Sequence, residues 1–182
     1  MTQRPTYKVE VAGLTRYFPL FEVAPGVRIA IFNMLGDTEI VKAAAPALAD
    51  KLQGKPGDVI VTAEAKSIPL AYELSVITRL PYVVLRKSYK SYMGRVLKAE
   101  TTSITTGQVQ TLHLDEKDRA LVEGKNVILV DDVISTGSTL EGMKNVMAQA
   151  KAKVVAITAV FTEGDFDWSH IIALGNLPVF TD

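Results

Sequence analysis

The chain has 182 residues, and its 20 lysine and arginine residues balance its 20 aspartate and glutamate residues, so the formal net charge is zero. A protein that grips a nucleic-acid backbone normally carries a clear basic excess, so this balance argues against a nucleic-acid partner. The absence of cysteine excludes disulfides, thiolate metal sites and cysteine nucleophiles. The N-terminal segment lacks the apolar core of a signal peptide, and no apolar run is long enough to cross a bilayer. We therefore expect one cytoplasmic domain with no membrane partner.

The first third of the chain predicts short strands and then a helix. Residues 17–22 and 27–32 have strand composition, and the turn signal Ala24-Pro25-Gly26 separates them. Asp37 stands where a helix N-cap is expected. The apolar residues that follow recur at helical spacing up to the Gly54-Lys55-Pro56-Gly57 stop.

The centre of the chain alternates apolar runs with helical patterns, which is typical of βαβ units around a parallel sheet. Strands are expected at residues 58–62, 82–86, 126–130 and 154–160, and helices at 68–78, with Ser67 as N-cap, and at 140–150. We therefore predict an α/β fold with a central, mainly parallel sheet flanked by helices.

Two further segments have no place in this alternation. Residues 87–100 lose the apolar periodicity, and a loop of that length in a compact domain is usually functional or disordered. Residues 101–105 and 108–112 are expected to form a hairpin across Thr106-Gly107. His113, after a strand, and His170, in a tail expected to be helical, offer no catalytic triad and are expected to be structural.

The stretch VILVDDVISTGSTLEG, residues 127–142, carries the strongest functional signal. A buried strand leads into Asp131 and Asp132 and then into Ser135, Thr136, Gly137, Ser138 and Thr139 at the start of a helix. Ligands of open α/β sheets bind at the carboxyl ends of strands, and a hydroxyl-rich turn at a helix N-terminus suits a phosphate. Adjacent carboxylates can accept hydrogen bonds from vicinal hydroxyls or hold hydrated Mg²⁺. The combination predicts a site for a ribose 5-phosphate.

A simpler interpretation makes the acid pair a solvated strand end and residues 138–141 a capping box. The strand, the two acids, the hydroxyl-rich turn and the helix nevertheless occur in the order that a binding site requires. That order favours the site.

This stretch resembles the signature of the type I phosphoribosyltransferases. The resemblance implies that Asp131 and Asp132 hold the ribose hydroxyls of phosphoribosyl pyrophosphate and, through water, Mg²⁺. It also implies that Ser135 to Thr139 bind the 5-phosphate. Ser138 stands where the purine members often have a second glycine.

The resemblance extends over about residues 17–162. Ala65, Lys66 and Ser67 resemble the family's pyrophosphate loop, and Arg86-Lys87 resembles a basic pair that reaches pyrophosphate in adenine-type enzymes. Residues 88–99 resemble the flexible catalytic lid, from which Lys90, Tyr92 and Arg95 would close over the diphosphate. Lys66 can equally be a surface lysine beside an N-cap, and the alternative for the lid is a solvated basic loop, which suits Arg95 and Lys98 equally well.

The sequence indicates the acceptor base and the general base less clearly than it indicates the phosphate site. Phe32 and Asn33 lie in a segment similar to the hood of the adenine and xanthine enzymes, and Glu163 lies where purine-type members contact the base. A carboxylate there would accept the exocyclic amine of adenine or the N–H groups of guanine, whereas the xanthine enzymes offer a lysine for oxo groups. Asn33 can equally be a turn residue before the helix, and for Phe32 alone a core aromatic residue is the favoured interpretation. Glu100 is a weak candidate general base, and Lys87 is expected to assist departure of pyrophosphate.

The resemblance implies a homodimeric, Mg²⁺-dependent purine phosphoribosyltransferase of purine salvage, acting on adenine, with a core at about 37–162 and a hood formed by 1–36 with 163–182. The alternatives are a xanthine, guanine or orotate enzyme, or a regulator that senses phosphoribosyl pyrophosphate without turnover. Few residues precede residue 17, which argues against an added DNA-binding winged helix.

Overall fold

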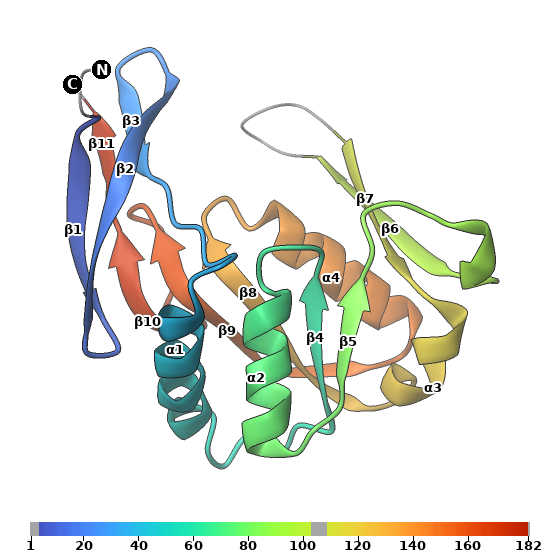
Figure 1. The fold of residues 1–182 in the computed structure, drawn as a ribbon. Coiled ribbons are helices and arrows are strands. Elements are labelled where there is room, and N and C mark those ends of the chain that lie inside the picture. Colours follow the sequence, from blue (N-terminus) through green and yellow to red (C-terminus); the bar gives the residue numbers. More distant parts are fainter. Residues whose placement is uncertain (1–3, 103–108, 182) are drawn as a thin grey trace.

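The computed structural model describes residues 4–102 and 109–181, and its centre is a parallel sheet (Figure 1). Five strands lie in the order β10-β9-β8-β4-β5, and every neighbouring pair is parallel. They are β4 (Val59–Ala63), β5 (Tyr82–Leu85), β8 (Asn126–Ile134), β9 (Lys153–Glu163) and β10 (Ile172–Leu177). The prediction of an α/β fold with a parallel sheet is confirmed, with β8 as its central strand.

Helices cover both faces of this sheet (Figure 1). On one face α1 (Thr38–Lys51) packs beside α2 (Ile68–Thr78), and on the other lies α4 (Ser138–Gln149). Because both faces are covered, the central strands are apolar on both sides, and the core divides into one hydrophobic cluster on each face. A short helix, α3 (Arg119–Val122), follows the single turn η2 (Glu116–Asp118) and leads into β8.

A second sheet forms a hood beside the end of the central sheet. It contains β1 (Thr6–Val11), β2 (Leu14–Ala24), β3 (Val27–Ala30) and β11 (Val179–Thr181), all antiparallel to their neighbours. Chain ends that are far apart in sequence therefore meet in one small sheet, which Figure 1 shows in blue and red. The expected hood range 163–182 is partly corrected, because β10 within it belongs to the central sheet.

A two-stranded hairpin stands beside α4 (Figure 1). It pairs β6 (Leu97–Thr102) with β7 (Val109–Leu114), so the expected hairpin exists but its strands extend further toward its base. The expected turn Thr106-Gly107 lies outside the described residues. The hairpin presses closely on α4, since a Cβ atom added at Gly142 would lie 2.9 Å from Thr101 Cγ2.

The residues between β5 and β6 form an anchored turn. The single turn η1 (Ser91–Met93) places the fully buried Met93 in the interior, and the Arg95 amide donates to Glu116 Oε2 at 2.9 Å. The predicted loop 88–99 is therefore tied down in this structure by a buried side chain and by a carboxylate, and its last residues already belong to β6.

Other predictions need correction at particular residues. The first predicted strand, 17–22, is the middle of the longer β2, and β3 ends at Ala30, two residues early. β1, β10 and β11 were not expected. Ser67 precedes α2, but its side chain makes no cap hydrogen bond. His170 lies in a turn before β10, not in a helix. Within the described residues, no helix has the length and apolar character to cross a bilayer.

Candidate active site

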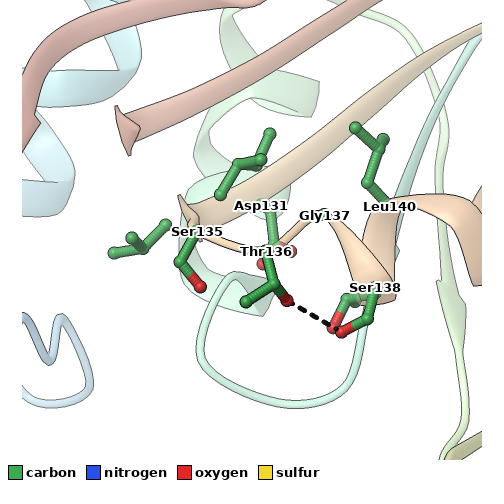
Figure 2. Close-up of a pocket in the computed structure, with 9 residues that line it drawn as sticks. Asp131, Ser135, Thr136, Gly137, Ser138 and Leu140 are labelled. Atoms are coloured by element: carbon green, nitrogen blue, oxygen red, sulfur yellow. Dashed lines mark hydrogen bonds between the residues drawn. The ribbon is translucent and has the colours of Figure 1, made fainter. Parts of the chain in front are cut away.

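The loop between β8 and α4 forms a small polar cavity, called here the loop cavity (Figure 2). The residues that line it are Asp131, Val133, Ile134, Ser135, Thr136, Gly137, Ser138, Thr139 and Leu140. Figure 2 shows the hydroxyls of Thr136 and Ser138 turned toward each other, with Thr136 Oγ1 donating to Ser138 Oγ at 3.3 Å. The five residues predicted to bind a phosphate thus line one cavity at a helix N-terminus.

Gly137 gives this loop its backbone shape. It is the N-cap of α4 at φ 77° and ψ 2°, and a side chain there would meet nothing within 4 Å, so its left-handed conformation is what favours glycine. Among the described residues no side chain caps this helix end, and Glu141 instead pairs with Lys144 at 2.8 Å. The capping-box interpretation of Ser138 and Glu141 is therefore wrong. The N–H groups of the first turn are available to an anion.

Asp131 and Asp132 lie within β8, in its buried run, and are each 9% exposed. Burial is the main reason that the pKa of the Asp131 carboxyl is raised above its ordinary value, and the nearby Asp132 carboxyl contributes to the same effect. The amide of Asp132 donates to Asp131 Oδ1 at 2.9 Å. Two carboxyl groups held this close favour a ligand that brings hydroxyl donors or positive charge.

A second cavity, the strand-end cavity, lies where β4, β5 and β8 end. Its lining residues are Ala63, Glu64, Ala65, Lys66, Ser67, Lys87, Asp131, Asp132, Val133 and Thr139. The structure thus brings the predicted residues Ala65, Lys66, Ser67 and Lys87 to the same cavity as both acids. Two lysines beside exposed loop residues suit an anion, as the sequence predicts.

Ser67 ties the wall of this cavity to the sheet through hydrogen bonds. It is 1% exposed, and its Oγ lies 2.7 Å from Thr62 Oγ1 and donates to the Ala63 carbonyl at 3.2 Å. Thr62 Oγ1 in turn donates to the Val130 carbonyl at 2.8 Å on the neighbouring strand. The hydroxyl of Ser67 therefore anchors the loop between β4 and α2 to the sheet.

Glu64 joins the two basic segments of the site, a role that the sequence analysis missed. Its Oε2 accepts the Lys87 amide N–H at 2.9 Å and lies 3.2 Å from Arg86 Nε. The hydrogen bond from the Lys87 amide is the main reason that the pKa of Glu64 lies below its ordinary value, and the Arg86 side chain contributes to the same effect. The sequence feature that could have indicated this role is the position of an acid directly before Ala65-Lys66.

Other predicted residues lie away from the walls of these cavities. Arg86 forms a backbone bridge with the buried His113, and its side chain turns to Glu64. Lys90 and Tyr92 are exposed on the anchored turn, where the Lys90 amide donates to Met93 Sδ. Glu100 is exposed on β6, opposite Thr111. None of Lys90, Tyr92 and Glu100 is among the residues that line the strand-end cavity.

A third cavity, the hood cavity, lies between β3 and the acid pair. The residues that line it are Ile29, Ala30, Ile31, Phe32, Lys66, Asp132, Val133, Ser135 and Glu163. Glu163 ends β9, and its partial burial raises the pKa of its carboxyl above the ordinary value. The predicted base contact Glu163 therefore faces the same cavity as Asp132.

The other two predicted base contacts are placed differently. Phe32 is 4% exposed and packs edge-on against Phe161 at 5.1 Å between ring centroids, with Phe18 at 5.3 Å. Its ring packs in the core, as the core interpretation of Phe32 expects, and the residue also lines the hood cavity. Asn33 is exposed, and its Oδ1 accepts the Leu35 amide at 3.3 Å in the turn before α1.

A fourth cavity, the apolar cavity, continues from the hood cavity. Its lining residues are Val23, Ala24, Val27, Ile29, Ser135, Thr136, Glu163, Phe166 and Val179. Most of these side chains come from the hood strands and from the loop after β9, and the sequence analysis did not assign them to a site. Phe166 comes directly after Glu163-Gly164-Asp165, so the loop that the sequence analysis singled out for base binding could have indicated Phe166 as a site residue as well.

Arg16 fixes the hood to the central domain. From β2 its Nε lies 2.8 Å from Asp37 Oδ2, and its Nη2 lies 3.0 Å from Asp37 Oδ1 and 2.9 Å from Glu39 Oε2. Asp37 also accepts the Ile40 amide at 3.1 Å as the N-cap of α1, which confirms its predicted role. One carboxylate thus caps a helix and positions the hood.

The acid pair fits a common mode of Mg²⁺ binding. Within residues 4–102 and 109–181, no group of three or more His, Cys, Asp or Glu side chains is placed to bind a metal. Mg²⁺ is commonly held by one or two carboxylates together with waters and substrate phosphates. Asp131 and Asp132 beside polar cavities fit that mode, in which substrate and water complete the coordination.

These cavities and the fold identify the family. Residues 33–170 match the family model of the phosphoribosyl transferase domain, and the chain belongs to that family. The five-stranded parallel sheet with its hood is the type I phosphoribosyltransferase fold.

Curated relatives of two kinds match the sequence. The purine biosynthesis transcriptional repressor PurR of Bacillus subtilis is 28% identical over 74% of this chain and 47% of its own length. A hypoxanthine/guanine phosphoribosyltransferase of Methanocaldococcus vulcanius is 40% identical over 58% of this chain and 54% of its own length. The chain spans about half the length of these curated relatives.

Solved structures of adenine phosphoribosyltransferases share the fold. The enzyme from Thermoanaerobacter pseudethanolicus superposes with a TM-score of 0.68 at 23% identity, over 79% of this chain and 84% of that one. The enzyme from Rhodothermus marinus superposes with a TM-score of 0.65 at 18% identity, over 94% of both chains. At this level of identity the likeness establishes the fold alone.

Proposed function

We propose that the chain is a purine phosphoribosyltransferase, which transfers ribose 5-phosphate from phosphoribosyl pyrophosphate to a purine base, preferably adenine, and releases AMP and pyrophosphate. The observation that carries the proposal is that Asp131 and Asp132 join three adjacent cavities. Asp131 borders the loop cavity, Asp132 borders the hood cavity, and both border the strand-end cavity. A ribose held by the acids would have its 5-phosphate, its diphosphate and its acceptor base on three different sides.

The chemistry that follows from this arrangement depends on charge and on exclusion of water. The bond from the anomeric carbon to the pyrophosphate oxygen breaks through an oxocarbenium-like transition state, and a ring nitrogen of the base forms the new bond. Lys66 and Lys87 border the strand-end cavity and stabilise the departing diphosphate. The amides of Gly137 and Ser138 hold the 5-phosphate. The hood shields the cation from water.

Mg²⁺ is part of the proposal as a cofactor. Asp131 and Asp132 would hold it through water, and it would supply positive charge for the diphosphate.

The preference for adenine rests on Glu163. A carboxylate accepts the N–H of an exocyclic amine, whereas xanthine offers an oxygen at that position, which a carboxylate repels. The relatives include hypoxanthine/guanine enzymes, so hypoxanthine and guanine are competing bases, and xanthine is the further alternative that the sequence analysis raises.

We further propose that the protein acts in purine salvage, as a homodimer in the cytoplasm. The exposed Tyr92 of the anchored turn and the side chain of Arg86 next to it are the groups that would approach a neighbouring subunit. Analytical ultracentrifugation tests the dimer directly: a monomer at micromolar concentration would contradict it.

The test of the function is incubation with phosphoribosyl pyrophosphate, Mg²⁺ and each of adenine, hypoxanthine, guanine and xanthine, with nucleotide and pyrophosphate both quantified. We expect equimolar AMP and pyrophosphate from adenine. Omission of Mg²⁺ tests the cofactor, and the pair Asp131→Asn with Asp132→Asn tests the site.

A regulator that binds phosphoribosyl pyrophosphate without turnover is the second candidate. The specific observation in its favour is that PurR of Bacillus subtilis matches 74% of this chain, a larger share than the 58% matched by the enzyme of Methanocaldococcus vulcanius. Tight binding of phosphoribosyl pyrophosphate with no turnover of any base would favour the regulator over the enzyme.

A further inference from the structure

The apolar cavity is large compared with the hood cavity to which it is joined. The hood cavity has a volume of about 200 Å³ and the apolar cavity one of about 620 Å³. Ile29, Ser135 and Glu163 line both. A ligand that fills the hood cavity beside Asp132 therefore has open space beyond Glu163.

The lining of that space is mostly hydrocarbon. Val23, Val27 and Ile29 reach it from the hood hairpin, and Phe166 and Val179 close it from the C-terminal part of the chain. Val23 is 55% exposed, Phe166 65% and Val179 40%. Apolar side chains that stand open around a cavity favour a ligand that removes them from water.

An unsubstituted purine does not match this lining. Its edges carry ring nitrogens, N–H groups and exocyclic amine or carbonyl groups, all of which lose hydrogen bonds against an aliphatic wall. The polar groups along the apolar cavity are the hydroxyls of Ser135 and Thr136 and the carboxyl of Glu163. Glu163 lies at the junction of the two cavities, so a single N–H directed at it would leave the next atoms of the ligand in the apolar cavity.

We propose that the acceptor is a purine whose 6-amino nitrogen carries an apolar substituent, with the ring in the hood cavity, the remaining N–H donated to Glu163, and the substituent in the apolar cavity. This proposal rests on the phosphoribosyltransferase function proposed above. The transfer itself is the same: the bond between the anomeric carbon and pyrophosphate breaks, a ring nitrogen of the base forms the glycosidic bond, and the ring proton leaves with pyrophosphate.

The test compares N6-benzyladenine with adenine as acceptors, with phosphoribosyl pyrophosphate and Mg²⁺ present. We expect kcat/KM for N6-benzyladenine to equal or exceed that for adenine. Val23→Ser removes apolar lining and Val27→Phe fills the space, and each should lower the ratio of the two kcat/KM values by about fivefold, the effect of one lost apolar contact. Val76→Ser is the matched control, because Val76 is 56% exposed on α2 and lines none of the four cavities, and the ratio should not change.

Binding gives a second readout that does not need turnover. Trp168 is the sole tryptophan of the chain, and its ring lies 5.5 Å from that of Phe166. Occupancy of the apolar cavity should therefore change its emission, and the titration with N6-benzyladenine should weaken about fivefold in Val23→Ser.

The outcomes separate the two proposals. The enzyme could turn over adenine while kcat/KM for N6-benzyladenine is far below that for adenine, in a ratio that neither Val23→Ser nor Val27→Phe changes. That result would overturn the proposal of a substituted acceptor and leave the proposed phosphoribosyltransferase function in place. Absence of turnover with every base would overturn the enzyme. In that case the fluorescence titration with N6-benzyladenine decides. Binding that Val23→Ser weakens supports the apolar subsite, and absence of binding overturns it.

Discussion

Glu64 Oε2 accepts the backbone N–H of Lys87 at 2.9 Å, so a carboxylate from the loop after β4 holds the end of β5 in place. This contact joins two segments that reach the same cavity from neighbouring strands. An acid inside a site proposed for pyrophosphate is unfavourable by charge alone. Its contacts with Lys87 and Arg86 indicate that it orients these groups.

Glu64→Gln should therefore weaken binding of phosphoribosyl pyrophosphate, even though it removes a negative charge from an anion site. We expect KM for this substrate to rise about fivefold, the effect of losing one charge-assisted hydrogen bond in a partly exposed position, with a smaller change in kcat. Glu123→Gln is the control, since Glu123 pairs with Arg119 at 3.7 Å away from the cavities. A lower KM in Glu64→Gln would show that the charge outweighs the orientation.

Asp131→Asn should stabilise the ligand-free protein while weakening its ligand binding. The raised pKa of Asp131 means that the unfolded chain ionises this carboxyl at lower pH than the folded protein does. The contribution of Asp131 to wild-type stability is therefore most favourable below the ordinary pKa of aspartate, falls as pH rises, and reaches its lower level above the raised pKa.

The stabilisation by Asp131→Asn should follow the same window. It should be absent near pH 4 and largest in the alkaline range, as measured by thermal unfolding across pH. The exposed Asp165 provides the control substitution, Asp165→Asn. Equal stabilisation at all pH values would show that the ionisation of Asp131 is not its cause.

Arg16→Gln should loosen the hood. Because Arg16 of the hood strand β2 binds Asp37 and Glu39 at the start of α1, its loss should raise KM for the base more than KM for phosphoribosyl pyrophosphate, whose proposed contacts lie outside the hood. Lys8→Gln breaks the exposed Lys8–Glu10 pair within the hood and serves as control. Steady-state kinetics with each substrate varied in turn measures KM for the base and KM for phosphoribosyl pyrophosphate separately. Parallel rises in both KM values would contradict a role specific to the hood.

Glu163→Lys should reduce the use of adenine more than that of xanthine. The substitution replaces an acceptor for the exocyclic amine by a donor for an oxo group, which reverses the match at the border of the hood cavity. Competition assays with both bases in one mixture measure the ratio. Asp165→Lys changes the same charge two residues away, and an equal effect of the two variants would assign the change to general electrostatics.

The sequence predicted the central sheet because its strands are apolar on both faces and are punctuated by helices. The phosphate loop followed for a similar reason: its residues are contiguous, so their order in the chain is their arrangement in space. The hood was missed in part. β1 alternates polar and apolar residues and pairs with the next strand, so its pattern could have indicated it, whereas β11 is three residues long and depends on pairing with β3 near the other end of the chain.

Relationships between distant residues were the least predictable from a single chain. Nothing in the spacing of Arg16 and Asp37 shows that they meet, and the apolar cavity combines residues from both ends of the sequence. Phe32 shows how one residue can serve two interpretations: three phenylalanines share one core contact, and Phe32 also lines the hood cavity.

The close approach of Gly142 to Thr101 has a consequence for how this chain can vary. A Cβ atom at position 142 would lie 2.9 Å from Thr101 Cγ2 and 3.0 Å from Leu112 Cδ1, so the helix that begins at the phosphate loop tolerates no larger residue while the hairpin keeps its own side chains. A change at 142 requires a compensating change at 101 or 112. The packing of the hairpin and the position of the helix that follows the phosphate loop are therefore coupled through this contact.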